Sequence, residues 1–174
     1  MNAPVLETER LRLRPTQARD FDDAAKLWGD AEVVRHIGGT PSTRSDAWQR
    51  MLRFPGLWAL LGYGYWTLET LDGAFIGQVG LADFKRDMTP DISGMPETGW
   101  VLSPAAHGRG YATEAMRGVL AWADETLDDP ETCCLIAPEN AASIRVAEKL
   151  GYTLWREGAI GEAPCLIFKR PRGG

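Results

Sequence analysis

The sequence is poor in the residues that build redox, metal and hydrolytic sites. Its 174 residues include three cysteines and two histidines. The cysteines show no Cys-x-x-Cys spacing, and Cys133 and Cys134 are neighbours in an apolar run, where successive side chains of a strand point to opposite faces. This disfavours a disulfide framework and a zinc site. A Ser-His-Asp triad would have to use His36 or His107, and no nucleophile elbow is present.

The sequence also lacks an excess of basic residues and a long apolar run. The formal net charge of −5 argues against a broad nucleic-acid surface but leaves room for a local anion site. No window is long enough to cross a bilayer, and the start, MNAPVLETERLRLRP, has no apolar core of signal-peptide length. We therefore expect a cytoplasmic protein that binds neither membranes nor nucleic acids.

Length and an ordinary globular composition predict one mixed α/β domain over residues 1–174. In the first half, TERLRLRP alternates like a strand, and ARDFDDAAKLWGD indicates a helix whose start Asp20 caps. A helical region over residues 42–61 is expected to be interrupted near Pro55-Gly56. GYWTLET and FIGQVGLADF then predict a hairpin, KRDMTPDISGMP a surface loop, and ETGWVL a short strand.

In the second half the apolar period changes to that of a helix after Gly110. The run TCCLIAP predicts a buried strand. Asn140 then caps a helix over residues 141–150, which Gly151 ends. YTLWRE and CLIFKR predict two more strands. The second half is thus a strand-loop-helix-strand-helix unit followed by a strand pair.

The stretch HGRGYATEA, residues 107–115, places two glycines around an arginine where this helix begins. Glycine-rich turns at helix starts bind anions, because free N–H groups and the helix dipole favour negative charge. The stretch nearly matches the dinucleotide pattern Gly-x-Gly-x-x-Gly, with Thr113 in the last place and Glu139 available for a ribose hydroxyl. The hairpin strands before it argue against that class, and no Walker motif follows. A tight turn without a ligand is a further interpretation.

Two longer stretches, WVLSPAAHGRGYATEA and APENAASIRVAEKLGYTLWREG, resemble the GNAT superfamily of acyl-CoA-dependent N-acetyltransferases. The likeness is closest to the branch of Rim-type ribosomal-protein-alanine N-acetyltransferases. The opening stretch LETERLRLRP also resembles the first strand of that branch. The family's loop, Gln/Arg-x-x-Gly-x-Gly/Ala, corresponds to residues 107–112, with His107 as a departure in the first place. The family's Asn-x-x-Ser corresponds to Asn140 and Ser143, and its Glu-Lys-Leu-Gly-Tyr/Phe to residues 148–152.

The resemblance implies a GNAT-type α/β (α+β) fold, with a mixed, mostly antiparallel sheet of about six to seven strands flanked by helices. It implies acetyl-CoA as co-substrate and no metal. The pyrophosphate is expected to accept N–H bonds at the helix start, with a charge-assisted contact from Arg109. Strand backbone and the Asn140 amide are expected to hold the pantetheine arm. The expected coenzyme A contacts are Trp100, Val101, Leu102, His107, Gly108, Arg109, Gly110, Tyr111, Ala112, Thr113, Asn140 and Ser143.

The implied chemistry needs a base for the amine, a donor for the oxyanion and a proton for the leaving thiolate. Glu97, at the start of the strand before the loop, is the candidate base; a surface charge is its structural alternative. The weaker candidates are Asp83 and Asp91. The Leu102 N–H is expected to polarise the thioester carbonyl. Ala147 stands where many relatives place an acidic tyrosine, so Ser143 is the candidate acid, with helix capping or a coenzyme A contact as its other interpretation.

These features predict an N-acetyltransferase that moves an acetyl group from acetyl-CoA to a primary amine by direct attack in a ternary complex. The amine belongs to a protein N-terminus or to a small molecule. We expect a monomer or a homodimer, with acceptor specificity in residues 30–66 and 85–96. The missing tyrosine leaves a non-catalytic acyl-CoA-binding or sensing module as the alternative, and a dinucleotide-binding oxidoreductase is third.

Overall fold

The structure, a computed structural model, describes residues 3–174. Within them, nine strands form one sheet in the order β1-β2-β3-β4-β6-β7-β9-β8-β5. Since β1 and β5 span two residues each, seven longer strands remain, as expected from the sequence. The strands are β1 Leu6–Glu7, β2 Leu11–Arg14, β3 Tyr65–Thr70, β4 Phe75–Ala82, β5 Met88–Thr89, β6 Glu97–Leu102, β7 Glu131–Ile136, β8 Thr153–Ile160 and β9 Ala163–Pro171.

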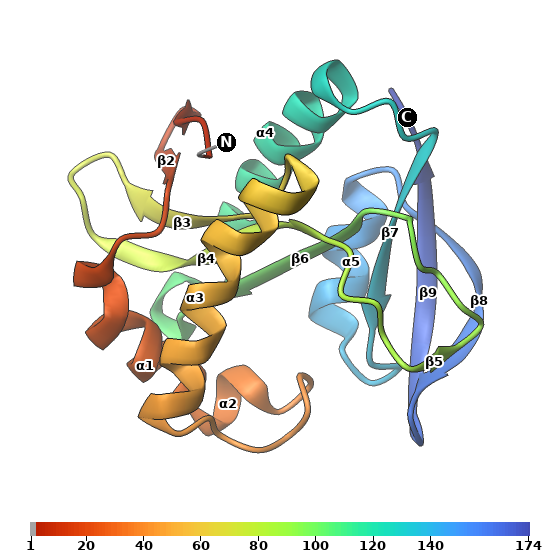
Figure 1. The fold of residues 1–174 in the computed structure, drawn as a ribbon, viewed down its shortest axis with the longest axis horizontal. Helices are drawn as coiled ribbons and strands as arrows, with labels where there is room; N and C mark the ends of the chain where they lie inside the picture. Colours follow the sequence, from red (N-terminus) through yellow and green to blue (C-terminus); the bar gives the residue numbers. More distant parts are fainter. Residues whose placement is uncertain (1–2) are drawn as a thin grey trace.

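Helices cover both faces of the first half of the sheet (Figure 1). Helix α4 packs on β2, β4 and β6, whereas α1 packs on α3 and on β4. Val101 and Leu102 are neighbours in β6 but belong to two different buried clusters, one with Trp28 of α1 and one with Met116 of α4. This follows because successive side chains of a strand point to opposite faces. The helices are α1 Phe21–Gly29, α2 Ala31–Val34, α3 Arg44–Leu61, α4 Tyr111–Thr126 and α5 Ala141–Lys149, with short 3-10 turns η1 Ala18–Asp20 and η2 Pro104–Ala106.

Strands β6 and β7 are the one parallel pair within residues 3–174, and they diverge soon after they meet (Figure 1). Their register holds a single pair, Glu97 with Cys133, beside a hydrogen bond from the Cys133 N–H to the Pro96 carbonyl at 3.0 Å. By contrast, β6 pairs with β4 over residues 97–102, and β7 with β9 over residues 131–136. Each half of the sheet is therefore complete, and the seam between the halves is open.

Helix α3 runs through Pro55, so the interruption expected there is wrong. Thr43 caps its start together with Asp46, and Gly62 ends it in the left-handed conformation. Proline removes one backbone donor from a helix. Burial of the apolar side chains on one face, including Trp58, offsets that loss. Across residues 3–174, no helix combines the length and the apolar character needed to cross a membrane.

Two local expectations near the sheet edges are also corrected. Asp20 stands at the first position before α1, but its carboxylate makes no cap to that helix. It accepts hydrogen bonds from the Gln17 N–H and the Arg14 guanidinium instead, since a buried charged partner is the stronger attraction. The second hairpin strand ends at Ala82, two residues before Phe84.

Candidate active site

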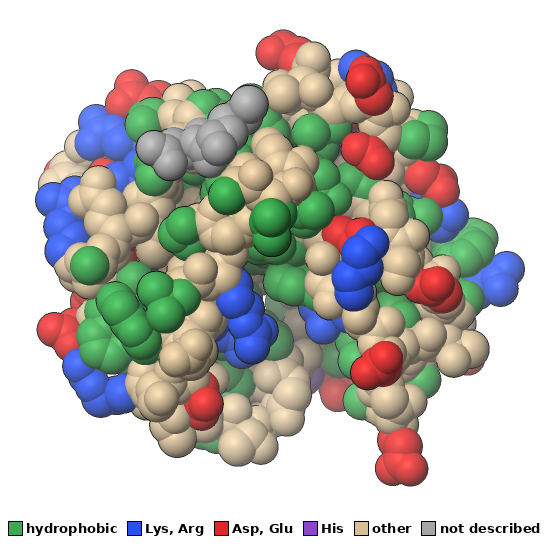
Figure 2. All heavy atoms as spheres, viewed as in Figure 1, with side chains coloured by type: hydrophobic (Ala, Val, Ile, Leu, Met, Phe, Trp, Pro, Cys, Tyr) green, Lys and Arg blue, Asp and Glu red, His purple; other side chains and the backbone are tan. Residues whose placement is uncertain are grey.

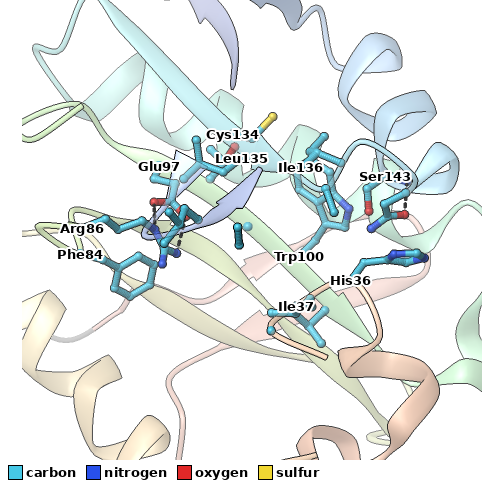
Figure 3. Close-up of a pocket in the computed structure, with 18 of the residues that line it drawn as sticks. His36, Ile37, Phe84, Arg86, Glu97, Trp100, Cys134, Leu135, Ile136 and Ser143 are labelled. Carbon is cyan, nitrogen blue, oxygen red and sulfur yellow. Dashed lines mark hydrogen bonds and ion pairs between the residues drawn. The ribbon is translucent and has the colours of Figure 1, made fainter. Parts of the chain in front are cut away.

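A cavity of about 740 Å³ lies where β6 and β7 diverge. It is lined by these two strands, by the segment after α2, by α3, and by the β8–β9 hairpin. The molecular surface is hollowed between the half that carries α3 and the half that carries β8 and β9, and Lys or Arg side chains stand beside the hollow (Figure 2). Glu97 and Trp100 of β6 and Ser143 of α5 surround the cavity in the close-up view (Figure 3).

The polar backbone of β6 is shared between β4 and this cavity. The Ser103 N–H donates to the Ile76 carbonyl at 2.9 Å, which makes Gly77 and Leu102 a pair without mutual hydrogen bonds. The alternation of an antiparallel ladder then turns the N–H and C=O groups of Trp100 and Leu102 away from β4 and toward the open seam. The N–H and C=O groups of Trp100 and the N–H of Leu102 are therefore available to an extended ligand that adds to the strand, whereas the Leu102 carbonyl is already bonded to His107.

Val101 differs from its two neighbours among the expected coenzyme A contacts. It is in register with Gln78, so the same alternation directs its backbone groups to β4. Its side chain lines the cavity and belongs to the buried cluster that contains Trp28. The geometry thus gives Val101 a side-chain contact with the cavity, in place of the backbone contact expected from the sequence.

The loop after β6 presents unused N–H groups at the start of α4. Gly108 and Gly110 have φ angles of 72° and 77°, which favour glycine, and Gly110 precedes the helix without a side-chain cap. In the described part of the chain, the N–H groups of residues 108–113 donate to no backbone carbonyl. Free donors at the positive end of a 16-residue helix suit an anion such as a pyrophosphate.

Contacts that the sequence did not predict hold this loop in place. Glu114 accepts hydrogen bonds from the Thr8 hydroxyl at 2.6 Å and from the Arg10 N–H at 2.8 Å, and it pairs with the Arg10 guanidinium at 2.6 Å. The same guanidinium donates to the Arg109 carbonyl at 3.1 Å. Since 104 residues separate Arg10 from Glu114, no local pattern relates them.

His107 turns its ring back to β6. Its Nε2 lies 2.9 Å from the Leu102 carbonyl oxygen and donates to it, because a carbonyl only accepts. The ring therefore connects the end of β6 to the glycine loop. This geometry favours a role in positioning the loop over the phosphate contact expected at the first place of the motif.

The second motif places polar groups on the β7 side of the cavity. Asn140 Oδ1 accepts from the Ser143 N–H at 3.1 Å, which confirms the predicted cap of α5 and leaves the amide NH₂ available to a ligand. Asn140 and Ser143 both line the cavity, and Ser143 lies on the same side as His36 (Figure 3). Ala147 is fully buried, so this position supplies no hydroxyl group.

A tyrosine from another part of the chain reaches the cavity. Tyr65 of β3 stacks on Phe54 of α3 with ring centroids 4.9 Å apart, and a Cβ at Gly99 would lie 2.1 Å from its hydroxyl. Burial, together with the nearby Glu97 carboxylate, raises the pKa of Tyr65 well above its ordinary value. The hydroxyl is thus protonated at neutral pH. Sequence reasoning missed Tyr65, because only the register of β3, β4 and β6 brings it to the cavity.

Glu97 lies on the cavity wall and is 6% exposed, so the surface-charge alternative is wrong. Its two oxygens accept hydrogen bonds from Arg86 Nε and Nη2 at 2.7 and 2.8 Å (Figure 3). This bidentate pair fixes the carboxylate. Each carboxylate oxygen has a second lone pair that the hydrogen bonds from Arg86 do not use. Sequence reasoning missed Arg86. This residue belongs to the loop over residues 85–96, for which the sequence predicted only a role in acceptor specificity.

The weaker candidate bases are both outside this cavity. Asp83 accepts hydrogen bonds from Lys85 Nζ and from the Gly94 N–H; burial opposes ionisation, but these bonds hold the pKa of Asp83 below its ordinary value. Asp91 accepts from the Ser93 N–H in an exposed turn. Both carboxylates thus stabilise loop turns. The described residues include no group of three or more His, Cys, Asp or Glu side chains that could hold a metal ion.

This combination of a mixed sheet, an open parallel seam and a glycine-rich helix start has close relatives. The model of the acetyltransferase (GNAT) domain family matches residues 10–153. An uncharacterised protein of Bacillus subtilis, YkkB, is 32% identical over 98% of both chains. A solved structure of a GNAT-family acetyltransferase from Bordetella pertussis is 30% identical, covers 97% of this chain and 99% of its own, and superposes with a TM-score of 0.83. The chain therefore belongs to the GNAT acetyltransferase family and is an acyltransferase.

More distant solved structures share the fold. The ribosomal L7/L12 α-N-protein acetyltransferase RimL, in complex with coenzyme A, has a TM-score of 0.78 at 13% identity, with 97% and 98% of the two chains covered. Spermidine N-acetyltransferase from Vibrio cholerae, in complex with coenzyme A and spermine, has a TM-score of 0.75 at 14% identity, with 95% and 98% covered. The Rim-type branch is thus one of several structural neighbours, which together show the fold.

Proposed function

We propose that the protein is an N-acetyltransferase that moves an acetyl group from acetyl-CoA to a primary amine by direct attack in a ternary complex. One observation carries the proposal. The unpaired backbone edge of β6 leads from the free N–H groups at the start of α4 to the cavity that contains Glu97. A ligand with a pyrophosphate at one end and an extended amide-containing arm fits this path, and coenzyme A is such a ligand.

The residues that hold the cofactor follow from this path. The N–H groups of residues 108–113 face the pyrophosphate, and the exposed Arg109 side chain adds charge. The Trp100 carbonyl and the Leu102 N–H, with the amide NH₂ of Asn140, hold the pantetheine arm. The cavity at the seam then receives the acetyl group and the amine.

The chemistry proceeds without a covalent enzyme intermediate. The amine nitrogen bonds to the thioester carbonyl carbon, and the free Trp100 N–H, on the cavity wall with Glu97, stabilises the oxyanion. The Leu102 N–H expected in this role from the sequence lies at the far end of β6, outside the cavity lining. Losing one such donor typically costs about 3 kcal/mol of transition-state stabilisation. The C–S bond then breaks while the adduct nitrogen loses its extra proton, and Ser143 donates a hydrogen bond to the departing thiolate and relays this proton to it, directly or through water, so that the serine hydroxyl is regenerated. Cys134 also lines the cavity, but burial raises the pKa of its thiol well above the ordinary value. A protonated thiol is a poor nucleophile, which supports direct attack.

Glu97 is the proposed base, acting through the lone pairs that Arg86 leaves unused. Replacing Glu97 with Gln should lower kcat by about 10²–10⁴, the usual contribution of general acid–base catalysis. The Ser143→Ala variant should lose less, because a thiolate leaves readily. The Glu97→Gln variant should bind coenzyme A as tightly as the parent.

Thiol release from acetyl-CoA, measured across a panel of amines, tests the activity, and calorimetry with coenzyme A tests binding. The matched control for Glu97→Gln is Asp91→Asn, which neutralises a carboxylate outside the cavity. Equal turnover in Glu97→Gln and the parent would exclude Glu97 as the base.

A non-catalytic acyl-CoA-binding module is the second candidate, because buried Ala147 stands at the position of the expected acid. That module would bind coenzyme A and release no thiol with any amine. A dinucleotide-binding oxidoreductase, the third possibility raised by the glycine loop, would bind NAD(P)H in preference to coenzyme A. Within residues 3–174 the sheet has a single parallel strand pair, unlike the parallel sheet of that class.

A further inference from the structure

Positive charge gathers on the wall of the cavity. The basic residues that line the cavity are Arg35, His36, Arg50, Arg53 and Arg86. Glu97 and Glu139 are the lining carboxylates. Glu97 is paired with Arg86, and Glu139 is 67% exposed and lies 3.7 Å from His36 Nδ1. Among residues 3–174, the guanidiniums of Arg35, Arg50 and Arg53 have no carboxylate within 4.0 Å.

Arg50 is the central member of this group. Its guanidinium carbon lies 3.8 Å from the centre of the Trp28 ring, and its Nε is buried without a hydrogen-bond partner in the described residues. Burial lowers the pKa of Arg50, and repulsion from Arg53 and Arg86 lowers it further. A buried donor without a partner is costly. Arg53, three residues on in α3, and Arg86 are thus close enough to Arg50 to repel its guanidinium, and an anion bound to Arg50 would relieve that repulsion.

The phosphates of coenzyme A are not that anion. Arg86 binds Glu97 at the first residue of β6, whereas the proposed pyrophosphate loop follows the last, Leu102. At the rise of an extended strand, these ends are about 17 Å apart. The positive charges of Arg86 and Arg50 both lower the pKa of Tyr65, so both guanidiniums lie near its hydroxyl. That hydroxyl lies beside Gly99, in the first half of β6. Arg50 and Arg86 thus adjoin the reacting end of the cavity.

We infer that the acceptor is a primary amine that carries its own carboxylate, and that Arg50, assisted by Arg53, binds this carboxylate while the amine faces Glu97. The inference rests on the proposed acetyl transfer and names its substrate class. A planar guanidinium fork matches a carboxylate with two hydrogen bonds. Such a wall disfavours polycationic amines. The carboxylate belongs either to a free amino acid or to an acidic residue beside a peptide N-terminus.

Matched acceptors test the charge preference. kcat/KM with acetyl-CoA is measured for an amino acid against its amide, and for peptides beginning Ala-Asp or Ala-Glu against Ala-Asn or Ala-Gln, with spermidine as the cationic comparison. The carboxylate form should be preferred by about tenfold to hundredfold, the usual worth of a charge-assisted hydrogen bond. A preference in the first pair identifies the free amino acid, and one confined to the peptides identifies the N-terminus.

Variants then assign the preference to the basic wall. Arg50→Gln and Arg53→Gln each remove one charge and should reduce the preference toward unity, with unchanged affinity for coenzyme A. The control is Arg44→Gln, which removes the same charge from α3 where the side chain pairs with Asp22 on the exterior. Because the Arg53 side chain is exposed, Arg53→Gln should fold normally, and it tests the same charge preference if Arg50→Gln does not fold.

Three results would overturn the inference: equal or better use of the amides and spermidine, a preference unchanged in both glutamine variants, or efficient transfer from succinyl-CoA to neutral amines. The last would assign the arginines to the acyl donor. Calorimetric binding of the amino acid to the coenzyme A complex is measured alongside turnover. Binding that Arg50→Gln abolishes supports the inference even without thiol release, whereas absence of thiol release refutes only the proposed activity.

Discussion

Two partly or fully buried arginines of this protein have opposite surroundings. Arg14 of β2 donates to Glu69 Oε2 at 2.7 Å and to the two oxygens of Asp20 at 2.8 and 2.9 Å. Asp20 also accepts from the Thr67 hydroxyl at 3.2 Å. Arg50 lies on the Trp28 ring and has no carboxylate partner among residues 3–174. One guanidinium is saturated by the fold, and the other is left with unused donors beside a cavity.

The difference separates a structural charge from one suited to a ligand. Hydrogen bonding to Asp20 raises the pKa of Arg14 despite burial, whereas burial lowers the pKa of Arg50. A saturated pair resists rearrangement, because removing either partner leaves a buried charge. An unsaturated charge can instead meet an anion from solution. Four predictions test this contrast.

Replacing Arg14 with Ala should have the largest effect on stability. It leaves Asp20 buried without its cation and Glu69 with only the longer contact to Arg12 at 3.4 Å, and the free energy of unfolding should fall by about 3–5 kcal/mol. Urea unfolding measures the change, and calorimetry of the remaining folded protein should give unchanged coenzyme A affinity. A loss below about 1 kcal/mol would show that the cluster is not the saturated site described above.

Asp20 should make the protein sensitive to acid. Burial alone would raise its pKa, but hydrogen bonds from Arg14 and the Gln17 N–H lower it below the ordinary value. The unfolded chain therefore takes up this proton first, so the stabilisation is present above about pH 4 and is lost as pH falls toward the lower pKa of the folded state. Urea unfolding from pH 7 to pH 3 should show a weaker pH dependence in Asp20→Asn, despite its lower stability at pH 7. Parallel curves would contradict this.

Replacing Arg50 with Leu should change the free energy of unfolding by less than about 1 kcal/mol, because relief of a buried charge offsets the lost attraction to Trp28. The comparison with Arg14→Ala, in the same urea titration, gives the sharpest test of the contrast. A loss as large as that of Arg14→Ala would make Arg50 a structural residue.

The smallest effect is expected for Arg44→Ala. Arg44 pairs with Asp22 at 2.7 Å on the surface, where both side chains are mostly exposed. Exposed pairs are worth about 0–1 kcal/mol. Thermal unfolding in low and in high salt should therefore differ little between this variant and the parent, and a larger loss would show that the exterior of α3 also contributes to the core.

Local patterns were sufficient for most elements. The apolar stripe after Gly110 predicted α4, and Asn140 predicted the cap and start of α5, because both signals lie within a few turns of chain. The failures were equally local. Pro55 was weighted as a helix breaker although buried neighbours hold α3 together, and Asp20 was assigned to a helix start although Arg14 attracts it more strongly.

The site was only partly predictable. Glu97, Asn140 and Ser143 were found because they lie at fixed distances from recognisable motifs, and all three line one cavity. Arg86 and Tyr65 were missed. Each comes from a segment without a motif, and each reaches the cavity through strand register or through a loop that folds back on β6.

By itself, the sequence determined the glycine-rich start of α4, the cap of α5 and the alternation of the strands, because these depend on backbone preferences of neighbouring residues. Only the tertiary structure decided that β6 and β7 diverge after one residue pair, that the backbone groups of Trp100 and the Leu102 N–H are free, and that Arg14 is paired with carboxylates while Arg50 is not. Those properties depend on pairing and burial between residues far apart in the chain, and no local preference encodes them.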